Sequence, residues 1–394
     1  MSLDRFPMIA GRAAIALAIL LPLSAYGYEF RLVPSLAARE EYNSNLFFTN
    51  QDQLDTWRTT VTPGLEAAGK TERLDAALSG NVSQLWYSAD SGLDDWNFDA
   101  KGRIAYRFTP VFRVSGTGQY GKSSIPDRFF ETTGVVVGAI ASYRQYYTAL
   151  AEYSPSEKAL ASLSYAFERL DYPDRPLQGG DTHAAGLGFS YNLSRFARET
   201  KARLDLGFGR GLYEGLTVNN YKLTVGVSRS VHELWSAQVN VGGRYTTSQF
   251  DILGVRQETN DTGWVGDASL VYTGEFTNAS FTFSSNIAPA YSSSGAVLRT
   301  AAVLNLSRRL LHELSGTFAA GYYWNRADAG QFSYRNVDDQ SARLRPGLQW
   351  KATKDIVLDA AYQYSWYDNK VAGGGKAVQN VFYAGVNLSH PFFE

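Results

Sequence analysis

The sequence contains few residues that could perform acid–base or metal chemistry, and these residues are scattered. It has four histidines and no cysteine, which excludes thiolate metal sites, cysteine nucleophiles and disulfides. His183 follows Asp181 by two residues, and an Asp/His pair at a rim can serve proton or acyl transfer. No third partner accompanies the pair, so we favour a solvated loop histidine. No metal-ligand spacing or phosphate loop occurs. The sequence therefore predicts a non-enzyme without metal or cofactor.

Basic side chains at alternate positions offer a different kind of chemistry. Arg103 and Arg107 alternate with apolar residues, and so do Arg343 and Arg345. Residues two apart in a strand lie on one face, and this face holds fewer acids than bases. Cross-strand pairing accounts for some of these charges, while the basic excess predicts an attraction for anions. The predicted basic lining consists of Arg58, Arg73, Lys101, Arg103, Arg107, Arg113, Arg203, Lys222, Arg244, Arg299, Arg343 and Arg345.

Aromatic residues are abundant, at 14% of the chain with 25 tyrosines, and glycine occurs 36 times. Some tyrosines fall on the predicted basic face, where their rings could stack against sugars. These are Tyr87, Tyr323, Tyr367 and Tyr383. The formal net charge of −1 gives no basic field for nucleic acid.

The elements that would position these residues are long β-strands. Segments 95–108, 313–326 and 355–368 alternate apolar with polar residues, and aromatics stand near both ends of the apolar face. Bilayers select aromatics at both interfaces, and the segments reach the ~9–11 residues that a tilted membrane strand needs. We predict an all-β, antiparallel transmembrane barrel of 18 strands, with 16 as the alternative.

The predicted connections alternate between short and mostly longer ones. Short periplasmic turns and long extracellular loops are typical of outer-membrane barrels. The longer segments include 41–53, 248–261 and 325–339. Residues 122–140 could lengthen the sixth strand or form a plug in the lumen.

The two ends of the sequence have patterns that are typical of export and of assembly signals. Residues 1–27 have a positive start, an apolar core and small residues before Tyr28, which is typical of a Sec signal peptide. Residues 28–394 would then form the barrel. The last strand alternates up to Phe392 and Phe393, and we expect it to close the barrel and to be read by the outer-membrane assembly machinery. Glu394 departs from the common aromatic ending.

The segments "PSLAAREEYNSNLFF" and "TVTPGLEAAG" resemble the openings of outer-membrane β-barrel porins found with bacterial exopolysaccharide and exosortase gene clusters. The resemblance rests on Pro34, Glu41, Tyr42, Asn43, Asn45, Phe47, Pro63 and Gly64. It implies a large Gram-negative outer-membrane barrel associated with a secreted polysaccharide, and no catalytic residues.

The basic face, the barrel pattern and the resemblance together indicate two functions. The first is a conduit that exports an anionic exopolysaccharide together with a periplasmic polysaccharide-export partner. The alternative is a general diffusion porin with a mild preference for small anions.

Overall fold

The computed structural model describes residues 29–125, 141–173, 179–252, 255–290, 295–371 and 374–392. The predicted signal peptide and most of the predicted plug lie outside these residues. The strands are β1 (Glu29–Asn43), β2 (Thr56–Lys70), β3 (Leu74–Tyr87), β4 (Asp95–Thr109), β5 (Phe112–Ser123), β6 (Ser142–Ser156), β7 (Ala159–Asp171), β8 (Gly180–Asn192), β9 (Thr200–Tyr213), β10 (Leu216–His232), β11 (Trp235–Ile252), β12 (Val255–Thr273), β13 (Thr277–Ala290), β14 (Gly295–Arg309), β15 (Leu314–Ala327), β16 (Val337–Lys351), β17 (Ile356–Asn369) and β18 (Lys376–Ser389). A 3-10 turn, η3 (Ser91–Leu93), precedes β4. Within the described ranges, no helix has the length and apolarity needed to cross a membrane.

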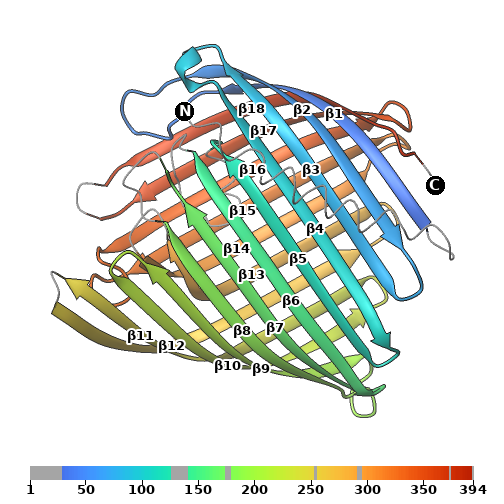
Figure 1. Cartoon of the computed structure of the whole chain (residues 1–394), viewed down its shortest axis with the longest axis vertical. Helices are drawn as coiled ribbons and strands as arrows, with labels where there is room; N and C mark the ends of the chain where they lie inside the picture. The colour runs from blue at the N-terminus through green and yellow to red at the C-terminus, as the bar shows by residue number, and fades with distance from the viewer. Residues whose placement is uncertain are drawn as a thin grey trace, which may run out of the picture.

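The strands form one closed antiparallel barrel, in which each strand pairs with its neighbours in chain order (Figure 1). The last strand, β18, pairs with β1 from Ser35 opposite Ser389 to Asn43 opposite Val381. Beyond β18, Phe392 exchanges two backbone hydrogen bonds with Leu32, at 2.7 and 3.0 Å. The prediction of 18 strands is therefore confirmed, and Phe392 lies in the closing seam.

The two faces of the wall differ as the alternation predicted. Directly opposed residues share a face, and Leu163, Leu187, Leu206 and Leu223 form one such row across β7 to β10. Each of these leucines is about half exposed, so the row lies on the outside. The neighbouring row on the inside is Ser164, Gly186, Gly207 and Lys222.

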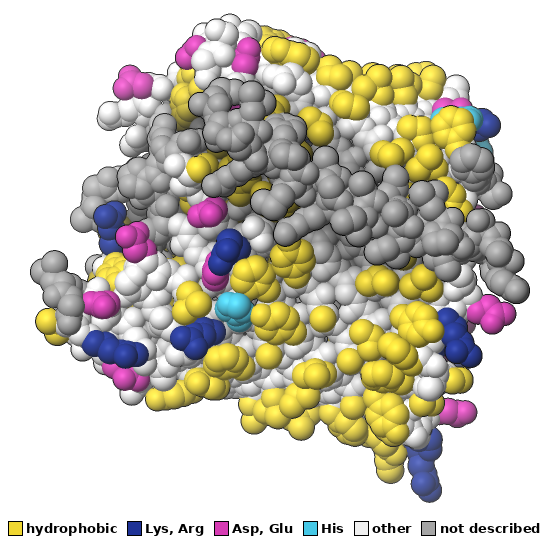
Figure 2. Space-filling model, viewed as in Figure 1, with side chains coloured by type: hydrophobic (Ala, Val, Ile, Leu, Met, Phe, Trp, Pro, Cys, Tyr) yellow, Lys and Arg dark blue, Asp and Glu magenta, His cyan; other side chains and the backbone are white. Residues whose placement is uncertain are grey.

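Apolar side chains continue around the outer surface. Hydrophobic side chains gather over the lower part of the visible face (Figure 2). Trp57, Trp86, Trp264 and Trp350 are among the exposed aromatics. An apolar outer surface on a closed barrel is suited to lipid, because the ladder between strands pairs the backbone polar groups that would otherwise face hydrocarbon. The barrel therefore spans a membrane.

The two ends of the barrel have different connections. At the short-turn end the connections include residues 71–73, 110–111 and 233–234. The opposite, long-loop end carries residues 44–55, 88–94 and 328–336 between strands. The prediction that 248–261 forms a loop was wrong, because β11 and β12 pair along their whole length to Ile252 opposite Val255.

The wall is interrupted between β12 and β13. Their ladder covers only Gly266–Thr273 of β12, while β13 and β14 remain paired to Ala290 opposite Gly295. The described ends of the two strands, residues 287–290 and 295–298, form what is called the hairpin tip below. They leave the wall and pack inside the barrel, where β14 contacts β9 and β10. Neighbouring Ala296 and Val297, which point to opposite faces, are both buried. Apolar residues on both faces give this tip more burial inside the barrel than in the wall.

Candidate functional site in the barrel lumen

A cavity of about 330 Å³ lies against the inner face of the arc from β16 through β18 and β1 to β3. Its lining residues belong to the inward parity of each strand, with Ile125 added from the segment after β5. Four lining residues are arginines and one is a glutamate. The full lining is Ala37, Arg39, Glu41, Arg58, Thr60, Thr62, Asn81, Ser83, Ile125, Arg343, Arg345, Gln363, Val381 and Tyr383.

The most buried part of the cavity wall is a charged pair. Arg58 donates to Glu41 at 2.7 Å, and both side chains are nearly inaccessible to solvent. The two residues are directly opposed on β1 and β2, so the strand register brings them together. Arg343, also buried, donates to the side chain of Gln363 on the neighbouring strand. Pairing of this kind is what keeps a buried charge tolerable.

The more open part of the cavity contains Arg39, whose guanidinium lies 4.1 Å from the centre of the Tyr383 ring. Arg39 is also 3.7 Å from Asp359, and its side chain is 45% exposed. The hydroxyls of Thr62 and Ser83 lie 2.8 Å apart on the same wall. The arrangement combines positive charge, hydroxyl groups and an aromatic ring in one place.

Segment 44–55 covers the cavity at the long-loop end. Its Leu46 packs with Leu85 and Tyr87 of β3 in a buried apolar cluster, against which Ile125 also lies. On the other side, Asn45 donates to the carbonyl of Val378 at 3.0 Å. The segment therefore spans from β3 to β18 and shields the cavity on the side of the long-loop end.

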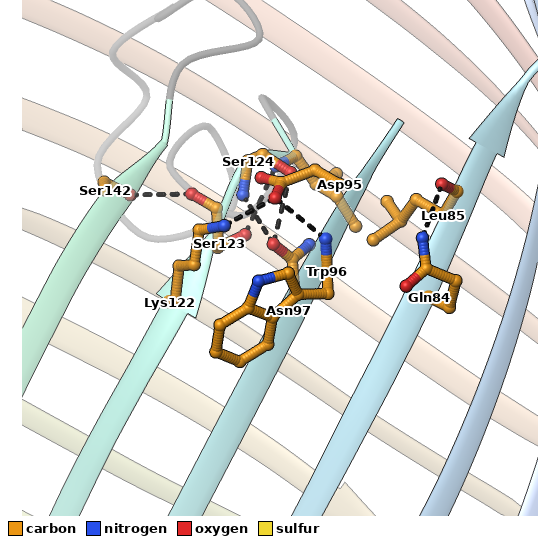
Figure 3. A network of polar contacts seen from close by, with 10 residues as sticks. Gln84, Leu85, Asp95, Trp96, Asn97, Lys122, Ser123, Ser124 and Ser142 are labelled. Carbon is orange, nitrogen blue, oxygen red and sulfur yellow. Dashed lines mark hydrogen bonds and ion pairs between the residues drawn. The ribbon is translucent and has the colours of Figure 1, made fainter. Parts of the chain in front are cut away.

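A polar network beside this cover directs the chain after β5 (Figure 3). The side-chain Oδ1 of Asn97 accepts hydrogen bonds from the backbone N–H and the hydroxyl of Ser124, at 3.0 and 3.1 Å. Lys122 donates to Asp95 at 2.5 Å and lies over the Trp96 ring. These bonds hold the point from which Ile125 enters the cavity lining. The predicted plug continues from here into residues outside the described ranges.

The opposite side of the lumen is filled by apolar side chains at the long-loop end. The hairpin tip of β13 and β14 and segment 328–336 meet the inner faces of β7, β9, β10 and β11 there. Phe332, at 1% exposure, is the largest fully buried side chain of this cluster. The tip is tied to the segment by a hydrogen bond of 2.8 Å from Ala296 N to the Phe332 carbonyl.

Tyr334 fastens segment 328–336 to the tight turn between β9 and β10. Its hydroxyl donates to the carbonyl of Gly215, and burial raises the pKa of Tyr334, so the group remains a donor. Gly215 has a φ of +67°, and a Cβ there would lie 2.6 Å from the Tyr334 hydroxyl oxygen. Glycine is required both by this conformation and by the close approach.

The predicted basic residues divide between these environments. Arg244 pairs with Asp261 at 2.5 Å beside Phe332, and Arg299 donates to Asn325 at 3.0 Å. Both belong to the filled side. Lys101 and Arg103 lie in the open lumen near Asp99 and Asp75, each at 3.0 Å.

The remaining predicted bases occupy inward positions of the wall, with one exception. Arg203 contacts Asp205 at 3.3 Å, and Lys222 lies opposite Gly207. Arg107 and Arg113 are opposed to each other and exposed near the short-turn end. Arg73 lies in the turn between β2 and β3 rather than in a strand.

The predicted tyrosines do not all present rings to the lumen. Tyr87 and Tyr323 are each 7% exposed, and Tyr87 packs in the apolar cluster with Leu46 and Leu85. Tyr367 contacts the ring of Phe48. Only Tyr383, of the four, lines the cavity. Arg39 and Glu41 were missed as site residues, although Arg39 shares its parity with inward Arg31.

The structure does not bring Asp181 and His183 together as a proton-transfer pair. Asp181 accepts two hydrogen bonds from Arg169, while His183 contacts the hydroxyl of Tyr165 at 2.7 Å. His183 is directly opposed to Phe167, whose parity is that of the outer leucine row. The pair thus lies on the outer face, and no group of metal-ligating residues occurs in the described chain.

A closed barrel with an apolar exterior and a charged lumen defines a transmembrane β-barrel protein. No family model and no curated protein matches the chain. Among solved structures, OccAB4 of Acinetobacter baumannii is 10% identical with a TM-score of 0.48, covering 92% of this chain and 98% of its own. OpdK of Pseudomonas aeruginosa, solved with vanillate, is 9% identical with a TM-score of 0.47, covering 92% and 99%. The ferric citrate transporter FecA is 9% identical with a TM-score of 0.47, covering 88% and 61%. These similarities concern the barrel fold.

Proposed function

We propose that the protein is an outer-membrane channel through which small anionic solutes diffuse. The observation that supports this best is the cavity with four arginines and one glutamate on the open side of the lumen. A basic lining lowers the energy of an anion in the passage and raises that of a cation. The short-turn end faces the periplasm in this proposal, as in outer-membrane barrels generally.

The covered mouth favours small solutes over a polymer. Segment 44–55 shields one side of the long-loop end, and the cluster around Phe332 fills the other. A passage for a polysaccharide chain would require both to move. Diffusion of small anions requires only hydrated gaps beside them.

Export of an anionic exopolysaccharide is the second candidate. It is favoured by the open basic residues at the short-turn side of the lumen, such as Arg31 and Arg103, whose side chains are 54% and 60% exposed. A polymer arriving from the periplasm would meet these residues first. Loss of secreted polymer after gene deletion, with uptake of small anions unchanged, would support export instead of diffusion.

The diffusion proposal is tested by the reversal potential of purified protein in planar bilayers under a KCl gradient. We expect anion preference in the native protein and a reduced or inverted preference in the variant Arg39→Glu/Arg103→Glu/Arg345→Glu. High salt should weaken the difference, because the Debye length falls from ~10 Å at 0.1 M to ~3 Å at 1 M.

Arg210→Glu is the matched control for this experiment, since Arg210 lies opposite His183 on the outer face. It should leave the reversal potential unchanged. Cation preference in the native barrel, or identical selectivity in the triple variant, would contradict the proposal.

A further inference from the structure

The cavity has features that a simple electrostatic lining does not require. A field that attracts anions needs only exposed charge, spread along the passage. Here hydroxyl and amide groups stand beside the arginines: Thr60, Thr62 and Asn81 line the same 330 Å³. This volume lies at the lower end of the range for small-molecule sites. Concave shape with a few convergent polar groups is typical of specific recognition.

The open arginine is restrained at the cavity wall by an aromatic ring. The Cζ atom of Arg39 lies 4.1 Å from the centre of the Tyr383 ring, a distance typical of a cation–π contact. A guanidinium edge pairs well with the two oxygens of a carboxylate. Asp359 lies 3.7 Å from Arg39, beyond the usual hydrogen-bond distance. Arg345 adds a second positive group to the lining.

The buried part of the site supports the open part. Arg58 and Glu41 satisfy each other at 2.7 Å, and Arg343 is held by Gln363. These pairs place fixed, ordered polar groups behind the cavity, as pre-organised sites require. Glu41 is the only acid in the lining and is committed to Arg58, while Asp359, beside the lining, forms an ion pair with Arg39 at 3.7 Å. Four arginines stand against these two acids, so the net charge of the site is positive.

We propose that this cavity is a binding site for a sugar acid, a monosaccharide that bears one carboxylate and several hydroxyls. Arg39 and Arg345 receive the carboxylate, and the groups on β2 and β3 receive the hydroxyls. Segment 44–55 covers the site at the long-loop end, so the sugar acid would enter it from the lumen on the short-turn side. The proposal deepens the proposed channel function, because it assigns a substrate class to that lumen.

The test uses the full mature chain in detergent, titrated calorimetrically with D-glucuronate, D-glucose and acetate. We expect glucuronate to bind measurably tighter than either control, because only it offers both carboxylate and hydroxyls. Arg39→Gln and Arg345→Gln should each weaken glucuronate about tenfold, the loss expected for one charge-assisted hydrogen bond. Thr62→Val should weaken the binding of glucuronate and leave the affinity for acetate unchanged. Arg210→Gln, which removes an equal charge outside the lumen, should have no effect.

Equal binding of acetate and glucuronate would overturn the sugar-acid assignment, and so would unchanged affinity in both arginine variants. Heat-modifiable gel mobility of each variant separates loss of binding from loss of folding. Bilayer conductance is recorded on the same samples. Conductance with no glucuronate binding would overturn this site but preserve the channel. Binding without conductance would overturn the channel but preserve the site.

Discussion

At the scale of single residues, the lumen contains arginines of two kinds that a sequence pattern cannot separate. Arg58, Arg244 and Arg299 are held by partners within the wall or the apolar filling. Arg39 and Arg103 have largely exposed side chains. Alternation predicts only which face a residue occupies. The role depends on what crosses the lumen to cover it, and that is set by contacts distant in the chain.

The pair of Arg58 and Glu41 is expected to matter for stability more than for passage. Arg58→Ala should leave the Glu41 carboxylate buried without its partner, which costs about 3–5 kcal/mol. The expected result is a lower midpoint of unfolding in urea, followed by the loss of heat-modifiable mobility.

The double substitution Arg58→Met/Glu41→Leu provides the matched control for this pair. It removes both charges and should restore most of the midpoint, since a buried pair and an apolar replacement are often similar in stability. A single variant as stable as the native protein would show that water reaches the pair.

At the scale of elements, the strands could be predicted and the fillings could not. The strand at 355–368 alternates over its whole length and appears as β17. The hairpin tip of β13 and β14 has apolar residues at consecutive positions, a pattern that suits burial in lipid and burial in the lumen equally well, so the sequence does not place the tip. Residues 248–261 are mostly polar, and this polarity resembled a loop. The cavity was missed for a related reason: six strands meet there, and only the register shows which positions coincide.

Phe332 is the residue on which the filled side of the lumen depends. Phe332→Ala should cost about 3–5 kcal/mol, as for other large-to-small core substitutions. It should also raise single-channel conductance, because the tip would lose the contact that holds it inside. Single-channel recording in bilayers and urea unfolding measure the two effects.

The turn at Gly215 offers an independent way to loosen the same filling. Gly215→Ala places a Cβ against the Tyr334 hydroxyl, and alanine is also strained at the positive φ of this position. Segment 328–336 should therefore detach at that end. We expect a smaller rise in conductance than for Phe332→Ala. Lower conductance in both variants would show that the filling does not obstruct the passage.

At the scale of the whole molecule, closure of the barrel depends on the last strand. Phe392 is bridged to Leu32 beyond the end of β18, so the pairing of the two terminal strands continues to the end of the described chain. Deletion of residues 392–394 should reduce assembly, because the closing seam and the expected recognition signal are both shortened. Quantification of folded barrel in outer-membrane fractions measures this. A normal level of folded protein would place the signal elsewhere in β18.

The incomplete ladder between β12 and β13 has a mechanical consequence. Only Gly266–Thr273 of the 19-residue β12 is bonded to β13, so the half of the barrel nearer the long-loop end is a split ring, while the other half is a complete hoop. A complete hoop resists radial stretching through every interstrand hydrogen bond at once. A split ring opens where side-chain packing alone bridges the gap. Lateral pressure from the surrounding membrane, or a molecule wedged in the lumen, would therefore deform this barrel first between β12 and β13, leaving the rest of its circumference almost rigid.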